Sequence, residues 1–453
     1  MIQSLLRLRY LHVVKNRSAA RCVFLTLFGC LYLGAARGEE MSWLDNGVIR
    51  AGVNLQMGGA LSSLMAKTDG RELVNNFDHG RQIQMSFYSG PVPFAPAGKQ
   101  PHEAWRKLGW NPVQAGDWAG NASRVLEHRN AGGELYTRVV PMQWPLEKVE
   151  AECEFESWIR LEGKVVDMRF RLTNKRLDLQ SYPPRHQELP AVYTSGQFNR
   201  VVTYSGAQPF KRGALSEWLD PGPPWKTFAA TENWAALVDS KGWGLGVWQP
   251  CTTYWKCGYV PGQTGKVGTK DDATGYLAPI GLEQIDHNIV YDYSCRLLVG
   301  SVAEIRRQVE DWSKALPLPV YRFQKGRDGW TQRGGLEGGF PWKGGWKVEA
   351  KTGLVSLESP AIFWDSEKVG RLRFKGGLRG KAGRLRVGWK PFRAEEPEGS
   401  TVFSLPPLEE GGDRTFALKD QPGYRGGMQR LTIKFEGVSV GDRIEVEAIE
   451  FLP

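Results

Sequence analysis

Long apolar runs are scarce in this chain of 453 residues, and none that could cross a membrane follows the first 40 residues. Only six cysteines and six histidines occur, and no second Cys or His pair stands at the spacing of zinc ligands. A Ser-His-Asp motif and a nucleophile elbow are also missing. These absences exclude a multi-span membrane protein, disfavour zinc, and lead us to expect neither a metal nor a cofactor.

Glycine, proline and tryptophan, by contrast, are abundant. The 54 glycines and 27 prolines supply many turns, and the 18 tryptophans supply large flat side chains. The apolar fraction of 41% is too high for a disordered chain, and the length suits two or three domains. Together these features favour an all-β protein that handles a flat-faced ligand such as a sugar ring.

Residues 1–38 resemble an export signal. A basic stretch precedes the apolar run from Cys22 to Ala36, which at about 15 residues is too short to span a membrane. Small residues, Ala36 and Gly38, stand at the −3 and −1 positions before Glu39. We therefore expect cleavage near Gly38, no stable membrane span, and a secreted or periplasmic protein. An uncleaved membrane anchor is the alternative.

The same N-terminal segment accounts for most of the positive charge. It holds six of the 59 lysines and arginines and none of the 49 acidic residues, so without it the net charge falls from +10 to +4. No Lys or Arg run of the kind that binds phosphate backbones remains. We therefore expect no nucleic-acid partner.

Four cysteines lie beyond this segment, an even number that would suit an oxidising compartment. Cys251 and Cys257 enclose an aromatic loop and could close it with a disulfide. Cys153 and Cys295 lie in strand-like runs and could equally be buried thiols.

Short runs with alternating apolar residues, bounded by Gly, Pro, Asn or Asp, fill residues 39–300. Such a pattern predicts large antiparallel sheets packed face to face. The clearest runs are Gly47–Leu55, Arg81–Tyr88, Glu134–Met142, Glu152–Leu161, Lys164–Thr173, Trp234–Val238, Leu245–Trp248 and Asn288–Val299.

One helix and a second, smaller β-region follow. Apolar residues at helical spacing predict a helix over Ser301–Ala315, and the Pro-rich segment up to residue 319 is the best domain boundary. Residues 320–453 again show short strands, and the runs Arg430–Phe435 and Asp442–Phe451 suggest a strand pair that closes a small sandwich. The sequence thus predicts a large antiparallel sandwich at 39–300, a helix and linker at 301–319, and a C-terminal β-sandwich at 320–453.

Three motifs resemble galactose mutarotase-like proteins, a family with a β-supersandwich of two large antiparallel sheets. The Gly-Gly turn of Gly58–Leu61, the following Thr68–Leu73, and the strand Arg169–Asn174 that ends in Asn are similar to segments of that family. The likeness spans residues 43–300. Residues 320–453 resemble the jelly-roll modules, similar to carbohydrate-binding modules, that accompany polysaccharide-active enzymes.

This resemblance implies an oligosaccharide or polysaccharide ligand, held in a groove on one sheet. It covers epimerases, glycoside hydrolases, polysaccharide lyase domains and binding domains, so the fold alone does not decide the activity. Mutarotases use a His, a second His and a late Glu, and in this chain His128, His186 and Glu283 occur in that order.

The segment from Tyr182 to Tyr193 carries the leading catalytic candidates. Its prolines fix an extended backbone, in which positions i and i+2 share a face about 7 Å apart. His186 and Glu188 should therefore point the same way and could act as acid and base on a sugar. Arg185 and Tyr193 are further candidate substrate contacts, although the alternation predicts that Tyr193 points to the opposite face of the strand. A structural ion pair is an equally good interpretation of His186 and Glu188.

The run from Asp78 to Tyr88 offers hydrogen-bonding groups for sugar hydroxyls. Gln82 and Gln84 share one strand face, and their amides can both donate and accept. Arg81 lies on the other face and could meet a uronate or sulfate if the substrate is acidic. An ordinary exposed polar face is the alternative.

The loop from Leu108 to Trp118 combines aromatic and amide groups. Its two tryptophans could stack on sugar rings, although one of them could instead fill the core. The candidate contacts are Trp110, Asn111, Gln114 and Asp117.

Asp286, at the start of a long strand, is a candidate second carboxylate for Glu188, as glycoside hydrolysis would require. Taken alone, a turn-capping role is the better interpretation of this residue. The leading hypothesis is an exported enzyme that cleaves or modifies a glycan by acid–base chemistry. The alternatives are a non-catalytic glycan-binding protein, a secreted epimerase-like enzyme, and a structural protein that merely retains the fold. Every one of these hypotheses except the structural protein requires the stretches near residues 82, 114 and 186 to meet in one groove.

Overall fold

The computed structural model describes residues 40–338, 342, 344–380, 383–393, 398–405 and 412–453. The expected export signal at residues 1–38 lies outside the described residues, so its cleavage stays a prediction. Among the described residues, no helix has the length and apolar character needed to cross a membrane.

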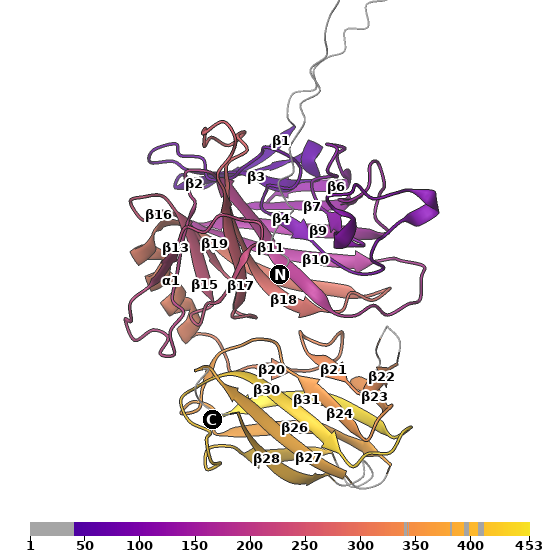
Figure 1. The fold of residues 1–453 in the computed structure, drawn as a ribbon. Helices are drawn as coiled ribbons and strands as arrows, with labels where there is room; N and C mark the ends of the chain where they lie inside the picture. The colour runs from indigo at the N-terminus through magenta and orange to yellow at the C-terminus, as the bar shows by residue number, and fades with distance from the viewer. Residues whose placement is uncertain (1–39, 339–341, 343, 381–382, 394–397, 406–411) are drawn as a thin grey trace, which may run out of the picture. The chain divides into compact units, whose positions relative to one another are not determined.

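Two large antiparallel sheets dominate the N-terminal two thirds of the chain (Figure 1). The first has nine strands in the order β13 (Ser216–Trp218), β12 (Arg200–Thr203), β15 (Trp234–Val238), β16 (Trp243–Trp248), β19 (Val290–Ser301), β10 (Val165–Asn174), β9 (Cys153–Glu162), β7 (Glu134–Val140) and β6 (Arg124–Ala131). The second has seven, in the order β14 (Lys226–Ala229), β17 (Tyr254–Val260), β18 (Thr274–Glu283), β11 (Arg185–Ser195), β4 (Gln84–Ser86), β5 (Pro112–Val113) and β8 (Met142–Gln143). The predicted all-β class is confirmed.

The two sheets share one core because their strands alternate as the sequence predicts. In β9 and β10 every second side chain is buried, for example Phe155 and Phe170. These residues pack in one cluster with Met85, Leu189 and Trp255 of the seven-stranded sheet. Side chains at the intervening positions of that sheet therefore point away from the core, onto what we call its outer face.

A three-stranded sheet of β1 (Met41–Asp45), β2 (Ile49–Asn54) and β3 (Ala60–Ala66) opens the described chain. The turn before β3 requires glycine at Gly58, which has a φ of +56° and where a Cβ atom would lie 1.9 Å from the carbonyl oxygen of Gln114. Short 3₁₀ turns are η1 (Leu55–Met57), η2 (Pro96–Gly98) and η3 (Arg106–Leu108).

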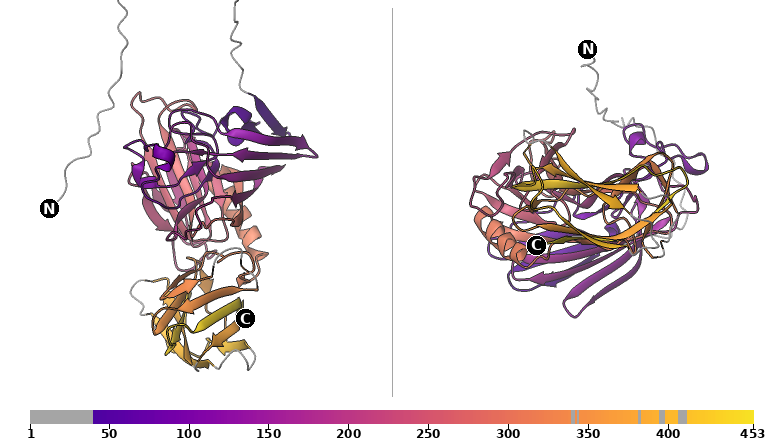
Figure 2. Two further views of the ribbon diagram at one scale, coloured as in Figure 1. Left: turned by 90° about the vertical axis from the view of Figure 1, so that its right-hand side faces the viewer. Right: turned by 90° about the horizontal axis from the view of Figure 1, so that it is seen from below.

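The α-helix described in the structure is α1 (Val302–Lys314), within one residue of the prediction at each end. Ser301 caps its first turn through a reciprocal hydrogen-bond pair with Glu304. Ile305 and Val309 are buried against β15 and β19 on the outer side of the nine-stranded sheet (Figures 1 and 2). The helix thus covers β15, β16 and β19 on this side of the sheet.

Two six-stranded sheets form a second β-sandwich after residue 320, with a core of its own. One contains β22 (Gly335–Glu337), β23 (Trp346–Ala350), β31 (Arg443–Leu452), β26 (Arg371–Arg379), β29 (Asp413–Ala417) and, beside β31, β20 (Val320–Tyr321). The other contains β21 (Thr331–Arg333), β24 (Leu354–Glu358), β30 (Gly427–Glu436), β27 (Gly383–Pro391), β28 (Gly399–Leu405) and, beside β30, β25 (Trp364–Asp365).

The last two strands do not form the pair that the sequence suggested. β30 lies in one sheet of this sandwich and β31 in the other, and their apolar residues, such as Ile433 and Ile444, meet in the core between the sheets. The alternating pattern identified both strands, but such a pattern does not specify which strand pairs with which. The prediction of a pair was wrong for this reason.

The cysteines Cys153, Cys251, Cys257 and Cys295 are free thiols, and all but Cys251 are buried. The disulfide considered between Cys251 and Cys257 is therefore not formed in this structure. Burial raises the pKa of the Cys257 thiol to about 12, so it is held as the unreactive protonated form.

Candidate functional site

The three stretches expected to meet do lie side by side in the seven-stranded sheet. Glu188 of β11 is paired with Ser86 of β4, and Ser86 is paired with Val113 of β5. Their backbones are therefore neighbours, as the sequence analysis required. Which side chains are available to a ligand is a separate question, because it depends on what covers them.

The polar residues predicted as sugar contacts on β4 and in the following loop are buried, with exposed fractions between 0 and 2%. They are Gln82, Gln84, Asn111, Gln114 and Asp117. Their side chains bond to backbone groups of the protein instead of facing solvent. The pairs, donor first, are Gln82 Nε2 with Asp78 O (2.7 Å), Gln84 Nε2 with His79 O (2.9 Å), Asn111 Nδ2 with Phe87 O (2.8 Å), Gln114 Nε2 with Gly58 O (3.2 Å), and Lys148 N with Asp117 Oδ2 (2.8 Å).

These hydrogen bonds correct the sequence interpretation. A buried amide needs partners, and in this structure distant loops supply them, so the five residues hold loops onto the sheet. Trp110 is also fully buried, and its indole nitrogen donates to Glu152 Oε2 at 3.0 Å. It fills the core, whereas Trp118 is exposed and stacks on His102 with ring centroids 4.1 Å apart.

The two arginines proposed as anion contacts are tied to backbone carbonyls. Arg81 donates to the carbonyl of Asp272 and forms an ion pair of 3.2 Å with Asp78. Arg185 donates to the carbonyls of Ser89 at 3.1 Å and Leu108 at 2.6 Å. Both guanidinium groups therefore hold loops in place through these backbone hydrogen bonds.

Asp286 is not a partner of Glu188. It is 1% exposed, lies 2.8 Å from the guanidinium of Arg327, and accepts a hydrogen bond of 3.0 Å from Ser181. Arg327 also contacts Glu337, so Asp286 belongs to a buried ion-pair network. These contacts give the carboxylate of Asp286 a structural role in holding the network together.

The His, His and Glu order of mutarotases does not assemble into one site here. His128 lies on β6 of the nine-stranded sheet, where its ring bonds to Ser42 and to the carbonyl of Tyr136. Glu283 lies at the end of β18, and burial raises its pKa to about 8, while Arg327 acts in the opposite direction. Of the three residues, His186 alone lies on the exposed outer face beside Glu188.

Glu188 is the most organised polar group on that outer face. Its side chain is buried to 9% exposure, and its carboxylate accepts hydrogen bonds from Tyr88 Oη at 3.0 Å and from Tyr276 Oη. Ser86 Oγ lies 3.2 Å from Tyr88 Oη and extends the chain of hydrogen bonds. Burial first, and then the charge of Glu188, raise the pKa values of Tyr88 and Tyr276 well above normal. Both phenols therefore stay protonated and act as donors.

Aromatic rings surround this carboxylate. The ring centroid of Tyr276 lies 4.9 Å from that of Tyr193 and 4.4 Å from that of Trp225. Tyr193, Trp225 and Tyr254 are half-buried, so each presents part of its ring. Gly258 lies directly beneath Trp225, where a Cβ atom would come within 2.4 Å of the indole.

His186 completes the group and is exposed. It precedes Glu188 by two positions on β11, so the two share a face about 7 Å apart, as predicted. Its ring lies 5.3 Å from that of Tyr254. Partial burial, and then the positive charges of Lys256 and Arg185, lower the pKa of His186. The imidazole is therefore neutral near pH 7 and able to accept a proton.

We call the set formed by these residues the Glu188 face. It spans three neighbouring strands, β17, β18 and β11, together with the segment just after β4 and the loop before β14. Its members are Tyr88, His186, Glu188, Tyr193, Trp225, Tyr254 and Tyr276. His186, Glu188 and Tyr193 were predicted from the sequence as site residues. Tyr193 was predicted on the opposite strand face, which is wrong, because a register shift between Glu188 and Val192 interrupts the alternation of β11. The tyrosines on neighbouring strands were missed, although Tyr88 follows Gln84 and Ser86 on the same alternating face.

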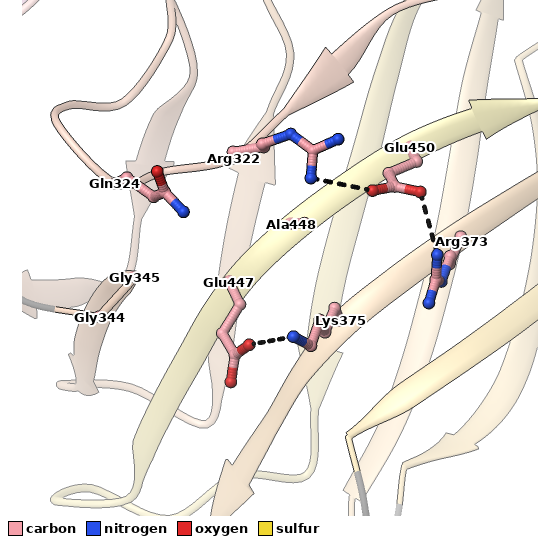
Figure 3. A pocket seen from close by; sticks show the side chains of 9 residues that line it. All are labelled: Arg322, Gln324, Gly344, Gly345, Arg373, Lys375, Glu447, Ala448 and Glu450. Atoms are coloured by element: carbon pink, nitrogen blue, oxygen red, sulfur yellow. Dashed lines mark hydrogen bonds and ion pairs between the residues drawn. The ribbon is translucent and has the colours of Figure 1, made fainter.

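A second polar region lies on the C-terminal sandwich, where a pocket of about 440 Å³ opens over β26 and β31 (Figure 3). Its charged side chains pair with one another: Arg322 and Arg373 lie 3.6 and 3.3 Å from Glu450, and Lys375 lies 2.9 Å from Glu447. We call these five residues the ion-pair face. None of the predicted site residues lines this pocket.

Within the described part of the chain, no group of three or more His, Cys, Asp or Glu residues is arranged to hold a metal ion.

Comparison with known proteins gives matches among solved structures. No family model matches the chain, and no curated protein does. A galactose mutarotase-like protein from Lactobacillus casei is 13% identical, with 57% of this chain and 99% of that chain covered and a TM-score of 0.36. A galactose mutarotase related enzyme from Lactobacillus acidophilus is 10% identical over 58% and 97% of the two chains, with a TM-score of 0.35.

A heparan sulfate lyase from Pedobacter heparinus also matches, at 8% identity over 68% of this chain and 37% of that chain, with a TM-score of 0.29. The resemblance to galactose mutarotase-like proteins noted in the sequence is thus found again among solved structures. It is a likeness of fold, and the activity has to be argued from the Glu188 face itself.

Proposed function

We propose that this protein is an exported carbohydrate-active enzyme that modifies or cleaves a glycan by acid–base chemistry on the Glu188 face. The observation that carries the proposal is a single carboxylate, Glu188, fixed by two tyrosine hydroxyls among partly exposed aromatic rings. Export follows from the sequence of residues 1–38 and is part of the proposal.

The aromatic rings suit a sugar as ligand. Tyr193, Trp225 and Tyr254 present apolar faces with polar edges, the combination that matches the C–H faces and hydroxyls of a pyranose. They extend over more than one strand, so a chain of sugar units could contact several of them.

The acid–base groups suit proton transfer at a bound sugar. The neutral imidazole of His186 can take a proton, and the carboxylate of Glu188 can orient the phenols of Tyr88 and Tyr276 or stabilise positive charge. Hydrolysis by two carboxylates would need Asp286 beside Glu188, but Asp286 is paired with Arg327. The arrangement therefore favours elimination or epimerisation over two-carboxylate hydrolysis.

A non-catalytic glycan-binding protein is the second candidate. It is favoured by the fact that both oxygens of Glu188 already accept hydrogen bonds and that the side chain is largely buried. In that case Glu188 would hold the aromatic rings in place for binding and would take no part in proton transfer.

The test is a screen of polysaccharides for binding and for turnover, read by a glycan array, by reducing ends and by the absorbance of unsaturated products. Wild type is compared with Glu188→Gln and with a control, Glu450→Gln on the ion-pair face. We expect turnover to fall by about 10²- to 10⁴-fold in Glu188→Gln and to be unchanged in the control. His186→Asn should lower turnover as well. Circular dichroism verifies that each variant is folded.

Binding without turnover in the wild-type protein would support the second candidate. Absence of any saccharide binding would overturn both. Turnover that survives in Glu188→Gln at the wild-type rate would remove Glu188 from the mechanism.

A further inference from the structure

Lys256 is a cation beside the Glu188 face, and it has no acidic partner among the residues that the structure describes. It lies on β17 between Tyr254 and Gly258, and its neighbours Trp255 and Cys257 point into the core, so its own side chain is on the outer face. It is half-buried, and no carboxylate of the described residues lies within ion-pair distance of its ammonium group. Its register partner on β18 is Ala278, which is fully buried.

The other cations near this face are already occupied. Arg81 and Arg185 donate to backbone carbonyls, as described above. Lys226, on the adjacent strand β14, forms an ion pair of 2.7 Å with Asp220. Lys256 therefore differs from these three neighbours in having no counter-charge from the described part of the chain.

Its position relative to Glu188 suits a bound sugar. Neighbouring strands lie about 4.8 Å apart, so β17 and β11, separated by β18, are about 10 Å apart. Tyr276 and Ala278 of β18 are buried between them, and the half-buried rings of Tyr193, Trp225 and Tyr254 pack against this buried cluster and form the surface there. A short saccharide laid across these strands would meet Lys256 at one end and the acid–base groups at the other.

We propose that the ligand of the Glu188 face is an anionic saccharide whose carboxylate or sulfate ester pairs with Lys256. This inference rests on the proposed function and adds the substrate class. A ligand anion would provide the counter-charge that the described residues do not supply, through a charge-assisted hydrogen bond to the ammonium group. Glu188 repels an anion, so the charged group of the ligand binds at β17 and the sugar ring extends towards β11.

The experiment measures binding by titration calorimetry with three probes: polygalacturonate, which carries carboxylates, a sulfated galactan, and a neutral galactan. The proteins are wild type, Lys256→Gln, Lys256→Arg and the control Lys226→Gln. We expect one or both anionic polymers to bind more tightly than neutral galactan, and their affinity to fall about tenfold or more in Lys256→Gln. Lys256→Arg should restore most of the affinity, and Lys226→Gln should leave it unchanged. The two anionic probes distinguish a carboxylate from a sulfate ester.

The inference is overturned if neutral galactan binds as tightly as the anionic polymers, or if Lys256→Gln binds the anionic polymers like wild type. In either case saccharide binding itself is retained, so the proposed function stands. Absence of binding to all three polymers would instead count against the proposed function together with the inference. The inference would also be overturned if Lys256→Gln lost affinity equally for the neutral and the anionic polymers, because the charge of Lys256 would then play no part in binding.

Discussion

The Glu188 face and the ion-pair face use charged residues in opposite ways. On the ion-pair face each lining cation has a carboxylate within 4 Å, and these side chains are mostly exposed (Figure 3). On the Glu188 face the carboxylate is bonded to neutral phenols, and the cation Lys256 has no acidic partner among the described residues. Aromatic rings line the Glu188 face, whereas no aromatic residue lines the pocket of the ion-pair face.

This difference shows why an opening in the surface is a poor guide to function. Exposed ion pairs across a sheet neutralise each other and contribute little to stability or to ligand binding. Charges that are fixed but not neutralised, set among rings, are available to a substrate. The following predictions test this contrast, in order of decreasing expected effect.

Removal of an aromatic ring should have the largest effect. We expect Trp225→Ala to weaken saccharide binding by about 30-fold, because a large ring at the centre of a binding surface typically contributes about 2 kcal/mol or more. Calorimetric titration with a polysaccharide ligand found in the screen measures this loss. Arg322→Ala on the ion-pair face is the control and should bind like wild type. Equal losses of saccharide affinity in the two variants would show that the two faces do not differ in binding.

Removal of one hydrogen bond to Glu188 should have the next largest effect. Tyr276→Phe deletes a phenol donor to a charged acceptor, which is worth about 1.5 to 3 kcal/mol, so we expect kcat to fall by about tenfold or more. Tyr424→Phe is the matched control, because that buried phenol donates to the carbonyl of Val369 in the other sandwich. It should destabilise the fold without changing kcat. An unchanged kcat in Tyr276→Phe would mean that Glu188 does not need this donor.

The pH dependence should follow His186. Its pKa lies below the usual 6.5, so the neutral base is lost, and activity falls, only as the pH drops through that lower value. Lys256→Gln removes a positive neighbour and should raise the pKa of His186, which moves the acid limb of the profile to higher pH. Titration of the His186 ring proton by NMR measures the shift. Lys375→Gln on the ion-pair face should leave it unchanged, and a downward shift in Lys256→Gln would contradict the assignment.

The smallest effect is expected on the ion-pair face itself. Lys375→Gln removes one partner of the exposed pair with Glu447, and solvent already screens both groups. We expect no resolvable change in the urea midpoint or in saccharide binding. A clear loss of binding would show that this face, too, contributes to recognition.

Much of the fold could be predicted from local patterns. The alternation in Glu152–Leu161 and Lys164–Thr173 predicted β9 and β10 nearly to the residue, and apolar residues at helical spacing predicted α1. Pairing was harder, as β30 and β31 show, because an alternating pattern fixes the two faces of a strand and leaves its neighbours open.

The candidate site, too, could be predicted only in part, because local patterns show which side chains share a strand face but not which strands are neighbours. His186 and Glu188 are two positions apart on one strand, so their shared face follows from strand geometry alone. The partners of Glu188 come from the segment just after β4 and from β18, at separations of 100 and 88 residues, and no local pattern links them.

The amino-acid sequence by itself determined the strands, the helix and its cap, and which side chains share a strand face, since these depend on residues a few positions apart. Only the tertiary structure decided that Gln84 and Trp110 are buried in contacts with distant segments, that Asp286 pairs with Arg327, and that no described carboxylate reaches Lys256. Burial and charge pairing are properties of neighbours in space, and folding brings those neighbours from far along the chain.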